Sequence, residues 1–458
     1  MSEHTTAQSV LFPDLFDKLL VARFDQQHAS SDGGAVLLRA ADGRLGLTER
    51  LAACLRDHRQ PGKVEHELHE LFRQRVFGIA CGYADCNDAA RLAKDPIHKL
   101  LVGRDPVAGE ALASQPTLSR FENSVSWMTL FRMGKVLAET VIETQRQRRH
   151  GKAKRITIEL DPTDDPTHGG QQLSFFNGHY DTWCYLPLVG FLKFDDEPEQ
   201  HLFTYVLRPG NAPAKLGALG ILRRVVERLS YAFPTAEILV RLDGGFACPE
   251  ILEFLEAARL HYVVAIAQNA VLSRQAAKLM ERARRKSQRS GKTEHVYGAC
   301  RYAAQSWNHK RRVVIKAEVV RLDEREPKDN PRFVVTNLSD PPQTVYEDVY
   351  CQRGDVENRI KELHHGLEID RTSCMRFQAN HLRGLMTAAA FVLMQELRTH
   401  AAGTSCARAQ VSTLRERLLK LGVWLEQSVR RIVLHFPNSL PFADEWYHVA
   451  RALGARCG

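Results

Sequence analysis

A segment from Tyr350 to His364 places one glutamate, Glu357, within a stripe of phosphate-compatible side chains on a single predicted helix. At about 100° per residue, its apolar side chains share a narrow arc: Val356, Ile360, Leu363 and Leu367. Its polar side chains share an arc about a quarter turn away: Tyr350, Arg353, Glu357, Lys361 and His364. We expect the first arc to pack against the protein and the second to face a charged ligand. A glutamate held between cations suits a site where a metal ion and a polyanion bind together.

Two aspartates, Asp161 and Asp243, each stand at the end of a predicted strand. These strands are the first and fourth of the sheet predicted below, in which such strands are neighbours. Like-charged carboxylates at close range repel one another unless a cation neutralises them. Mg²⁺, with Mn²⁺ as an alternative, fits this need because it binds a few carboxylate oxygens together with water and phosphate. Two such ions, held also by Glu357, would activate a water or a 3′-hydroxyl and stabilise the leaving oxygen.

Each of the three carboxylates also has a simpler explanation. Asp161 lies in a stretch rich in Asp-Pro and Pro-Thr pairs, which are common turn formers, together with Asp164 and Asp165. Asp243 precedes two glycines and could form a turn, and Glu357 could pair on the surface with the lysine four residues later. The joint occurrence of all three, in the right order of elements, favours a shared site.

The elements that must position these residues predict a ribonuclease-H-like α/β domain, in which helices cover a mixed sheet. The expected order is strand, strand, strand, helix, strand, helix and strand, over residues 156–161, 180–190, 202–207, 215–230, 236–242, 249–260 and 262–267. In residues 268–348 this alternation of strands and helices is interrupted. A basic helix over 271–286 is followed by three segments rich in Val, Tyr and Ile, which predict an inserted antiparallel unit: 294–307, 311–322 and 332–338.

Positive charge is concentrated in this insertion. The chain has a net charge of +9, and residues 271–316 alone contain 13 Lys or Arg against two acids, Glu281 and Glu294. A solvated helix face would explain such a block, but aromatic residues are interleaved with the charges, at Tyr297, Tyr302 and Trp307. This combination favours the binding of a polyanion.

A helical region precedes the α/β domain, with expected helices over 35–41, 47–54, 64–82, 87–93, 117–123 and 126–147. Within it, Leu112–Asn123 resembles the end of a helix-turn-helix, with Gln115 and Pro116 in the turn. A capping turn in an ordinary helical bundle explains the same residues equally well. The expected domains are an arm (1–34), a helical DNA-binding domain (35–150), the catalytic core (151–268 and 346–380), the basic, β-rich insertion (269–345) and a helical C-terminal region (381–458).

Composition excludes several classes of protein. With 458 residues and 44% hydrophobic content, the chain is expected to form two to four domains. No run reaches the roughly 18 apolar residues of a membrane span, and the N-terminus lacks the layout of a signal peptide, so we expect a cytoplasmic protein without a membrane partner. The ten cysteines include no Cys-x-x-Cys pair, which predicts reduced, mostly buried thiols rather than a zinc knuckle or a disulfide framework.

Four motifs together resemble the DDE transposases of bacterial insertion sequences, most closely the insertion-sequence 1380 family. They are Leu160-Asp-Pro-Thr-Asp-Asp-Pro-Thr-His-Gly169, Arg241-Leu-Asp-Gly-Gly-Phe246, Arg332-Phe-Val-Val-Thr-Asn-Leu338 and Tyr350-Cys-Gln-Arg-Gly-Asp-Val-Glu-Asn-Arg-Ile-Lys-Glu-Leu363. The resemblance covers nearly the whole length and extends to residues 367–374 and 435–442. It implies a catalytic, metal-binding triad of Asp161, Asp243 and Glu357 that uses Mg²⁺, with Asp164 and Asp165 as alternatives to Asp161.

The resemblance also implies a tyrosine, arginine, glutamate and lysine signature on the glutamate helix. Tyr350, Arg353 and Glu357 match it, and the first two are expected to contact DNA phosphates. The lysine does not match, because His364 stands at its position and Lys361 lies one turn earlier as a substitute cation. A histidine is only partly charged near neutral pH, so this phosphate contact is expected to differ from the usual one.

Trp307 is a further candidate, because members of the resembled family use an aromatic residue of the insertion to hold an extruded base. A core or hairpin tryptophan is the alternative. His168 and His179, which flank the first motif, are expected to be structural.

The resulting hypothesis is a transposase that binds the terminal inverted repeats of its element as double-stranded DNA, cuts beside them and joins the 3′-hydroxyl to target DNA. Assembly on two ends implies a homodimer, associated with the nucleoid. One alternative is a catalytically silent DNA-binding repressor derived from a transposase, against which the intact carboxylates argue. The other is a ribonuclease-H-like nuclease without strand transfer, against which the long basic insertion argues.

Overall fold

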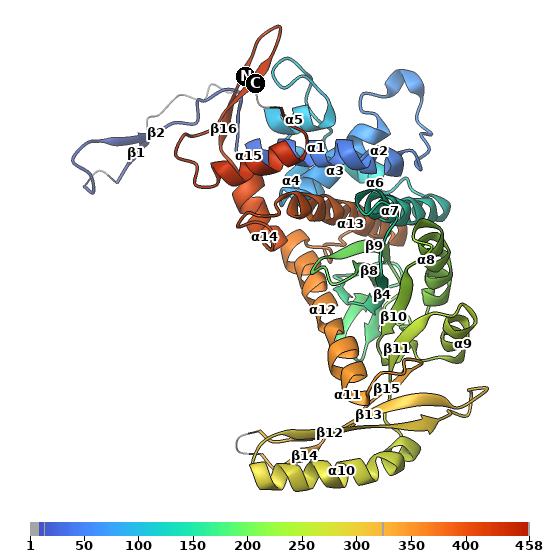
Figure 1. The fold of residues 1–458 in the computed structure, drawn as a ribbon. Coiled ribbons are helices and arrows are strands. Elements are labelled where there is room, and N and C mark those ends of the chain that lie inside the picture. Colours follow the sequence, from blue (N-terminus) through green and yellow to red (C-terminus); the bar gives the residue numbers. More distant parts are fainter. Residues whose placement is uncertain (1–8, 13, 323–324, 457–458) are drawn as a thin grey trace.

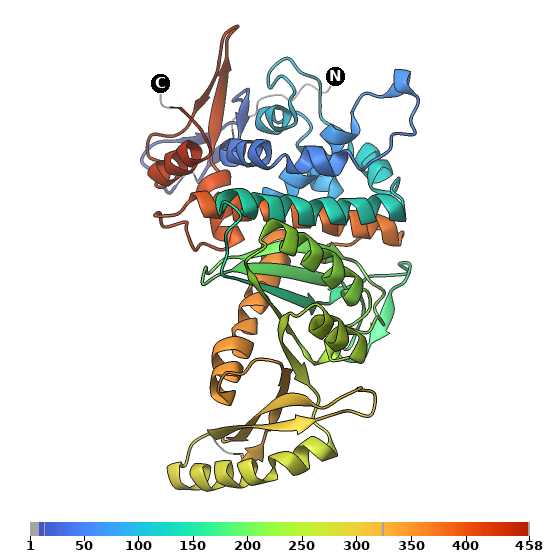
Figure 2. The same cartoon turned by 45° about the vertical axis from the view of Figure 1, so that its right-hand side comes forward.

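The computed structural model describes residues 9–12, 14–322 and 325–456 of the chain (Figure 1). Residues 1–8 of the expected arm and Cys457 lie outside this part. Figure 1 shows a helical layer next to the chain termini, then a sheet covered by helices, and finally the basic insertion at the opposite end. Figure 2 shows the same succession after a turn of 45°.

A mixed sheet runs through the middle of the molecule and into the insertion. Its order is β12-β13-β15-β11-β10-β4-β8-β9, and β14 pairs with β13 beside this path. The strands are β4 (Arg155–Pro162), β8 (Leu188–Phe194), β9 (Gln200–Val206), β10 (Glu237–Leu242), β11 (His261–Ile266), β12 (Glu294–Tyr302), β13 (Arg311–Val320), β14 (Lys328–Asp329) and β15 (Arg332–Thr336). β4, β10 and β11 are parallel, whereas β8 pairs antiparallel with both β4 and β9. The first and fourth strands of the expected order, β4 and β10, are therefore neighbours, as predicted.

The expected alternation of strands and helices is present, with one difference. α8 (Ala218–Ala232) and α9 (Pro249–Ala257) lie on one side of the sheet, and α12 (Gly354–Lys361) lies on the other (Figures 1 and 2). The segment expected as one strand over 180–190 forms two, β7 (Thr182–Tyr185) and β8, because Pro187 interrupts the backbone hydrogen bonding. β7 joins β5 (Asp165–Pro166) and β6 (Phe175–Asn177) in a small separate sheet.

The insertion is antiparallel, as expected, but it continues the central sheet instead of forming a unit of its own. β15 pairs antiparallel with β11, and β13 and β12 follow from β15. Val313, Ile315 and Val335 are buried in the main apolar core, so the sheet and the insertion share that core. α10 (Ala270–Ser290) packs against β12 and β13 through an apolar face that includes Leu272 and Ala276.

The helical layer differs from the prediction in two respects, an additional helix and the absence of the expected helix-turn-helix. Its helices are α1 (Val36–Leu45), α2 (Leu47–Ala52), α3 (Leu68–Ala80), α4 (Cys86–Arg91), α5 (Pro96–Val102), α6 (Gln115–Glu122) and α7 (Trp127–Arg148), of which α5 was not expected. Gln115 and Pro116 begin α6 and do not form a turn before it, because proline is favoured in the first turn of a helix. Residues 103–114 separate α5 from α6, so the helix-turn-helix interpretation is wrong.

The long helix α13 (Phe377–His400) joins the helical layer to the sheet. It contains the expected apolar segment 385–397 and is buried along almost its whole length. It packs against α3, α7 and β9. Within residues 9–12, 14–322 and 325–456, no helix combines the length and the apolarity that a membrane span needs.

The C-terminal region is not wholly helical, contrary to the prediction for 381–458. After α14 (Val411–Leu414), β16 (Val423–Gln427) and β17 (Ile432–His435) form a hairpin, and α15 (Ala443–Ala452) follows. β16 also pairs with β3 (Ala29–Ser30), so the two ends of the chain meet. Before β3, β1 (Ser9–Leu11) and β2 (Leu20–Ala22) form a second hairpin that projects from the molecule (Figure 1). The nine described cysteines are free; four are buried, four are half-buried and Cys351 is exposed.

Candidate active site

Asp161 and Asp243 lie side by side at the carboxyl ends of two parallel strands. β4 and β10 pair in register with Leu160 opposite Leu242, so the next residue on each strand is an aspartate. Asp161 lies within β4, and Asp243 begins the turn after β10, where its Oδ1 accepts a hydrogen bond from the Gly245 amide at 2.8 Å. The buried apolar side chains of both strands hold this register, because a slip would turn them to the other face of the sheet.

The guanidinium of Arg353 lies close to all three carboxylates, those of Asp161, Asp243 and Glu357. Its Nη2 donates to Asp161 Oδ1 at 2.7 Å and lies 3.6 Å from Asp243 Oδ2. Its Nη1 lies 3.9 Å from Glu357 Oε1. The three carboxylates predicted from the sequence therefore surround one cation. Their side chains are 10%, 29% and 58% exposed, in chain order, so the group extends from a buried floor to the surface.

Asp161 is the most buried of the three and the least favourable to ionise. Burial raises its pKa to about 7 despite the opposing effect of Arg353, and the charges of Asp243 and Glu357 add to the rise. Burial also acts against the charge of Arg353, but the surrounding carboxylates prevail and raise its pKa. The site therefore concentrates negative charge that a single guanidinium offsets only in part.

A buried ion pair lies beneath the two aspartates. Arg241, two residues before Asp243, donates from its Nε to Glu159 Oε1 at 2.7 Å, and Glu159 stands two residues before Asp161. Both side chains of the pair are 2% exposed. The Nη1 of Arg241 also donates to the Val349 carbonyl at 2.5 Å. This contact connects the two aspartate strands with the segment that leads into the glutamate helix.

The glutamate helix is not a uniform α-helix. π-helical segments at Val345–Tyr350 and Glu362–Gly366 flank it, and a 3₁₀ turn at Cys351–Arg353 precedes α12. A π-helical turn holds more residues than an α-helical turn, so it rotates the side chains that follow. The predicted apolar arc is nevertheless buried at Val356, Leu363 and Leu367, and Glu357 and Lys361 are exposed as predicted, whereas Tyr350 and His364 are half-buried.

His364 and Lys361 have different surroundings. His364 is largely buried: its Nε2 hydrogen-bonds with Thr163 Oγ1 at 2.9 Å, and its Nδ1 lies 3.2 Å from Asp370 Oδ2. Burial opposes the charge of Asp370, but the contact with His364 prevails and lowers the pKa of that carboxyl. Lys361 is exposed on α12. Of the two, Lys361 carries the accessible charge.

The two aromatic candidates pack against other rings. Tyr350 is half-buried, with the ring of Tyr346 at 5.5 Å between centroids. Trp307 is half-buried within the insertion, where Tyr302 lies edge-on at 5.5 Å and the guanidinium of Arg311 lies 5.1 Å over its ring. These contacts do not bring Trp307 together with the three carboxylates. They are the contacts of a structural tryptophan, and its role toward an extruded base stays a prediction.

Asp165, one of the alternatives to Asp161, is held elsewhere. Its Oδ1 accepts a hydrogen bond from Thr372 Oγ1 at 2.8 Å, and its side chain is fully buried. Burial raises the pKa of this carboxyl well above its usual range. Asp164 is half-buried. Asp161 is the member of this motif that contacts Arg353 in the part of the chain that the structure describes.

The supporting pair Glu159–Arg241 was missed by the sequence reasoning, although the sequence contains its signal. Each residue stands two positions before an aspartate, and alternate residues of a strand point to the same face. A charged residue inside an otherwise apolar strand needs a partner when buried. Opposite charges at the same position of two neighbouring strands are such partners.

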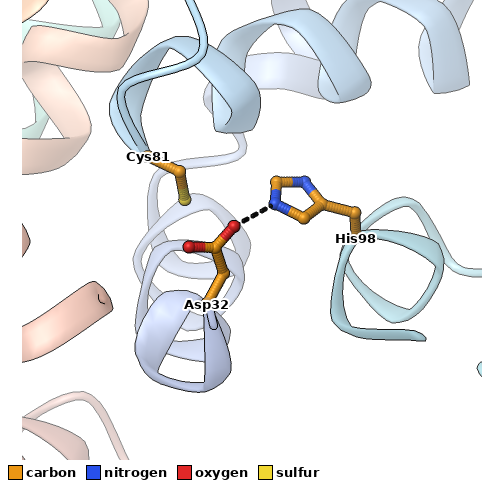
Figure 3. A group of neighbouring side chains, drawn as sticks. All are labelled: Asp32, Cys81 and His98. Carbon is orange, nitrogen blue, oxygen red and sulfur yellow. Dashed lines mark hydrogen bonds and ion pairs between the residues drawn. The ribbon is translucent and has the colours of Figure 1, made fainter. Parts of the chain in front are cut away.

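A second group of possible metal ligands lies in the helical layer (Figure 3). The ligand atoms of Asp32, Cys81 and His98 lie within 4.8 Å of one another, and all three residues are buried. Asp32 Oδ2 lies 2.8 Å from His98 Nε2, and Asp32 Oδ1 lies 2.8 Å from the ammonium of Lys420. Burial raises the pKa of the Cys81 thiol, which therefore stays protonated. Because a lysine already neutralises the carboxylate, this group joins the N-terminal segment to the C-terminal region and is not assigned to a metal.

Comparison with known proteins identifies the family. No curated protein matches the chain. A family model described as transposase DDE domain group 1 matches residues 12–456, nearly the whole length. Enzymes of this kind cut and join DNA and generally use divalent metal ions, so DNA is a partner of this protein. The chain belongs to the transposase DDE domain group 1 family.

Proposed function

We propose that the protein is the transposase of an insertion sequence of the 1380 family. It binds the terminal inverted repeats of its element, cuts the DNA by metal-dependent hydrolysis and joins the 3′-hydroxyl ends to target DNA. The observation that carries this proposal is the convergence of Asp161, Asp243 and Glu357 around Arg353. The order and directions of β4, β8, β9, β10 and β11 support a ribonuclease-H-like core interrupted by the basic insertion.

The residues of the site fit a divalent cation. Three carboxylates offer the oxygen ligands that Mg²⁺ or Mn²⁺ prefers, and the space between them already holds a cationic group, the Arg353 guanidinium. Asp161, Asp243 and Glu357 would hold the metal, with two ions as the proposed number. Bound there, the ions would supply positive charge for the attacking and the leaving oxygens of an in-line displacement.

Arg353 is the residue whose contacts change most in this proposal. Its planar fork of donors suits a phosphate as well as a carboxylate. With the charge of the carboxylates offset by a metal, the Arg353 guanidinium would be available to donate to a DNA phosphate, beside the hydroxyl of Tyr350. The strand positions of the two aspartates and the packed side of α12 hold the three carboxylates in place.

A stripe of cations along α10 supports contact with a long stretch of DNA backbone. Its exposed members are Arg274, Lys278, Arg282, Arg285 and Arg289, and we call them the α10 stripe. At about 100° per residue they fall within an arc of about 80°, opposite the buried face of Leu272, Ala276 and Met280. At about 1.5 Å per residue the stripe is about 22 Å long. This length matches about six phosphate spacings of one DNA strand.

Replacing Arg274, Lys278 and Arg282 together by glutamine should weaken DNA binding and make it less dependent on salt. Each cation on a phosphate contributes about 0.9 to the slope of log K against log salt, so the slope should fall by about 2 to 3. Fluorescence anisotropy with a labelled duplex at several salt concentrations measures this. The matched control, Arg274→Lys with Arg282→Lys, keeps the charge and should keep the slope. An unchanged slope in the glutamine variant would show that the α10 stripe faces only solvent.

Alanine substitutions should separate the roles of Lys361 and His364. Loss of Lys361 should weaken binding uniformly across DNA sequences and lower the salt slope by about 1, with the unfolding free energy unchanged. Loss of His364 removes the contacts with Thr163 and Asp370 and should cost about 1–3 kcal/mol of unfolding free energy. Anisotropy and denaturant titration on both variants, with Lys361→Arg as the control, measure these effects. A stable His364→Ala variant with the reduced slope would assign the phosphate contact to His364 instead.

The test of the proposed function uses the purified full-length protein, Mg²⁺ and a DNA fragment that carries an element end. Cleavage at the end followed by covalent joining to a second DNA is the expected result. Cleavage without joining would replace the proposal with a nuclease, and binding without cleavage would replace it with a repressor. Our candidate for end recognition is the helical region 35–150, and two ends require a homodimer that associates with the nucleoid through its DNA.

A further inference from the structure

The hairpin formed by β1 and β2 exposes an unusual amount of apolar surface. The exposed apolar side chains of the hairpin are Phe12, Leu15, Phe16, Leu19 and Leu20, and Phe24 follows directly after it; their exposed fractions run from 41% to 106%. A two-stranded hairpin has little stability in water unless one of its faces packs against another surface. Figure 1 shows that this hairpin extends away from the rest of the chain. Some other surface must therefore cover it.

The same chain carries an apolar groove of about 530 Å³ between α7, α8 and β9. Trp127, Phe131, Val206, Ile221 and Val225 are among the residues that line it. Trp127 and Phe131, on α7, remain 51% and 52% exposed. A continuous apolar groove of this size on a protein surface indicates a binding site. We call it the α7–α8 groove.

The hairpin cannot fill the groove of its own chain. β3 is fixed to β16 by the pairs Ser30 with Val423 and Ala29 with Trp424. Residues 23–28, which connect β2 to β3, span at most about 20 Å when fully extended. β16 lies on one side of the layer formed by α7 and α13, and α8 with β9 lies on the other, in both views (Figures 1 and 2). The occupant of the groove must come from another molecule.

Both surfaces combine apolar side chains with charges of both signs. The hairpin carries Asp14, Asp17 and Lys18 between its strands, beside Leu15 and Phe16. The groove is lined by Lys135, Arg224 and Arg228 together with Glu139 and Glu227. The match between the two surfaces therefore depends on their apolar area.

We infer that the hairpin of one copy docks in the α7–α8 groove of a second copy, and the reverse, to form a two-fold dimer. Each exposed aromatic side chain buries on the order of 150 Å² or more when covered. Three phenylalanines and three leucines per hairpin, exchanged in both directions, reach the roughly 1,200–2,000 Å² of a stable interface. A reciprocal exchange also closes the assembly, because each copy gives one hairpin and accepts one. The inference concerns the assembly of the chain and does not depend on its chemistry.

The first test is the mass of the full-length protein in solution, by light scattering after size exclusion. The wild type should be a dimer, and both Phe16→Asp with Leu19→Asp on the hairpin and Phe131→Asp in the groove should be monomers. Val429→Asp, at a fully exposed apolar residue of the β16–β17 turn, is the matched control and should remain a dimer. Circular dichroism shows whether each variant is folded. A monomeric wild type, or folded hairpin and groove variants that remain dimers, would overturn the inference.

A cross-link then identifies the partner of the hairpin. In a background with Cys351→Ser and Cys457→Ser, which removes the exposed thiol among the described cysteines and the cysteine outside them, Leu19→Cys and Phe131→Cys are combined in one chain. Mild oxidation should give covalent dimers on a non-reducing gel. The control pair Leu19→Cys with Val429→Cys should not give them. A disulfide within one chain, or equal cross-linking in the control, would show that the hairpin does not occupy the groove of a second copy.

Discussion

Replacing Asp161 or Asp243 by asparagine will abolish DNA cleavage. Each change keeps the size of the side chain but removes a charge that would hold the proposed metal ion. A divalent ion in such a site contributes several kcal/mol to transition-state stabilisation, and each 1.4 kcal/mol is a factor of ten. We therefore expect the single-turnover rate with Mg²⁺ to fall by at least about 10³-fold, measured on a labelled fragment that carries an element end.

The fold should survive these substitutions. Asp161 is buried beside two like charges, and burial raises its pKa to about 7, so its ionised form does not favour the folded state when no metal is bound. Asparagine removes this repulsion while it keeps an oxygen that accepts a hydrogen bond from Arg353. Lost cleavage with an unchanged melting temperature is the expected combination. Unfolding of the asparagine variants would instead assign a structural role to the aspartates.

Asp165→Asn provides the matched control for Asp161→Asn. Asp165 belongs to the same motif and is equally buried, but it bonds to Thr372 and stands apart from Arg353. Burial raises the pKa of this carboxyl and so disfavours its charge, and an amide of the same shape still accepts the hydrogen bond from Thr372, so Asp165→Asn should preserve both folding and cleavage. Loss of cleavage in Asp165→Asn, with cleavage retained in Asp161→Asn, would refute the proposed triad.

The strands that carry the aspartates were predictable because the residue pattern that predicts each strand lies within the strand itself. Residues 156–161 and 236–242 are short runs with strand-forming side chains, and each ends at an aspartate followed by a turn. The structure places the corresponding strands, β4 and β10, next to each other in parallel. Periodicity within α12 also identified Val356 as buried and Glu357 as accessible. These features depend on neighbouring residues along the chain.

The features that were missed depend on distant parts of the chain. The pairing of β15 with β11 joins segments separated by a long helix and three strands, and nothing within residues 332–338 specifies that partner. The π-helical segments on either side of α12 were also missed, because the apolar spacing was interpreted with a uniform α-helical period. β16 and β17 lie in a region expected to be helical, although Val423 and Leu425 alternate with exposed residues there.

Replacing Arg241 by methionine will destabilise the protein and slow cleavage together. The change leaves the Glu159 carboxylate buried without its cation, and such a loss costs about 3–5 kcal/mol of unfolding free energy. Burial already raises the pKa of Glu159 against the effect of Arg241, so its charge depends on this partner. Denaturant titration measures the loss. Arg284→Met is the control, because its pair with Asp329 is half-exposed and should contribute at most about 1 kcal/mol.

The double variant Glu159→Met with Arg241→Met separates the effect of the ion pair on the stability of the protein from its effect on the position of Glu357 relative to the two aspartates. Replacing both members of a buried ion pair by apolar residues is often neutral, so most of the unfolding free energy should return. The contact from Arg241 to the Val349 carbonyl does not return, and this contact connects the aspartate strands with the helix of Glu357. We therefore expect the double variant to be stable but still slow in cleavage, with end binding near that of the wild type. Full recovery of the rate would show that the pair only stabilises the sheet. A rate that stays low would mean that the spacing between Glu357 and the two aspartates depends on a residue beneath the site that never touches the DNA.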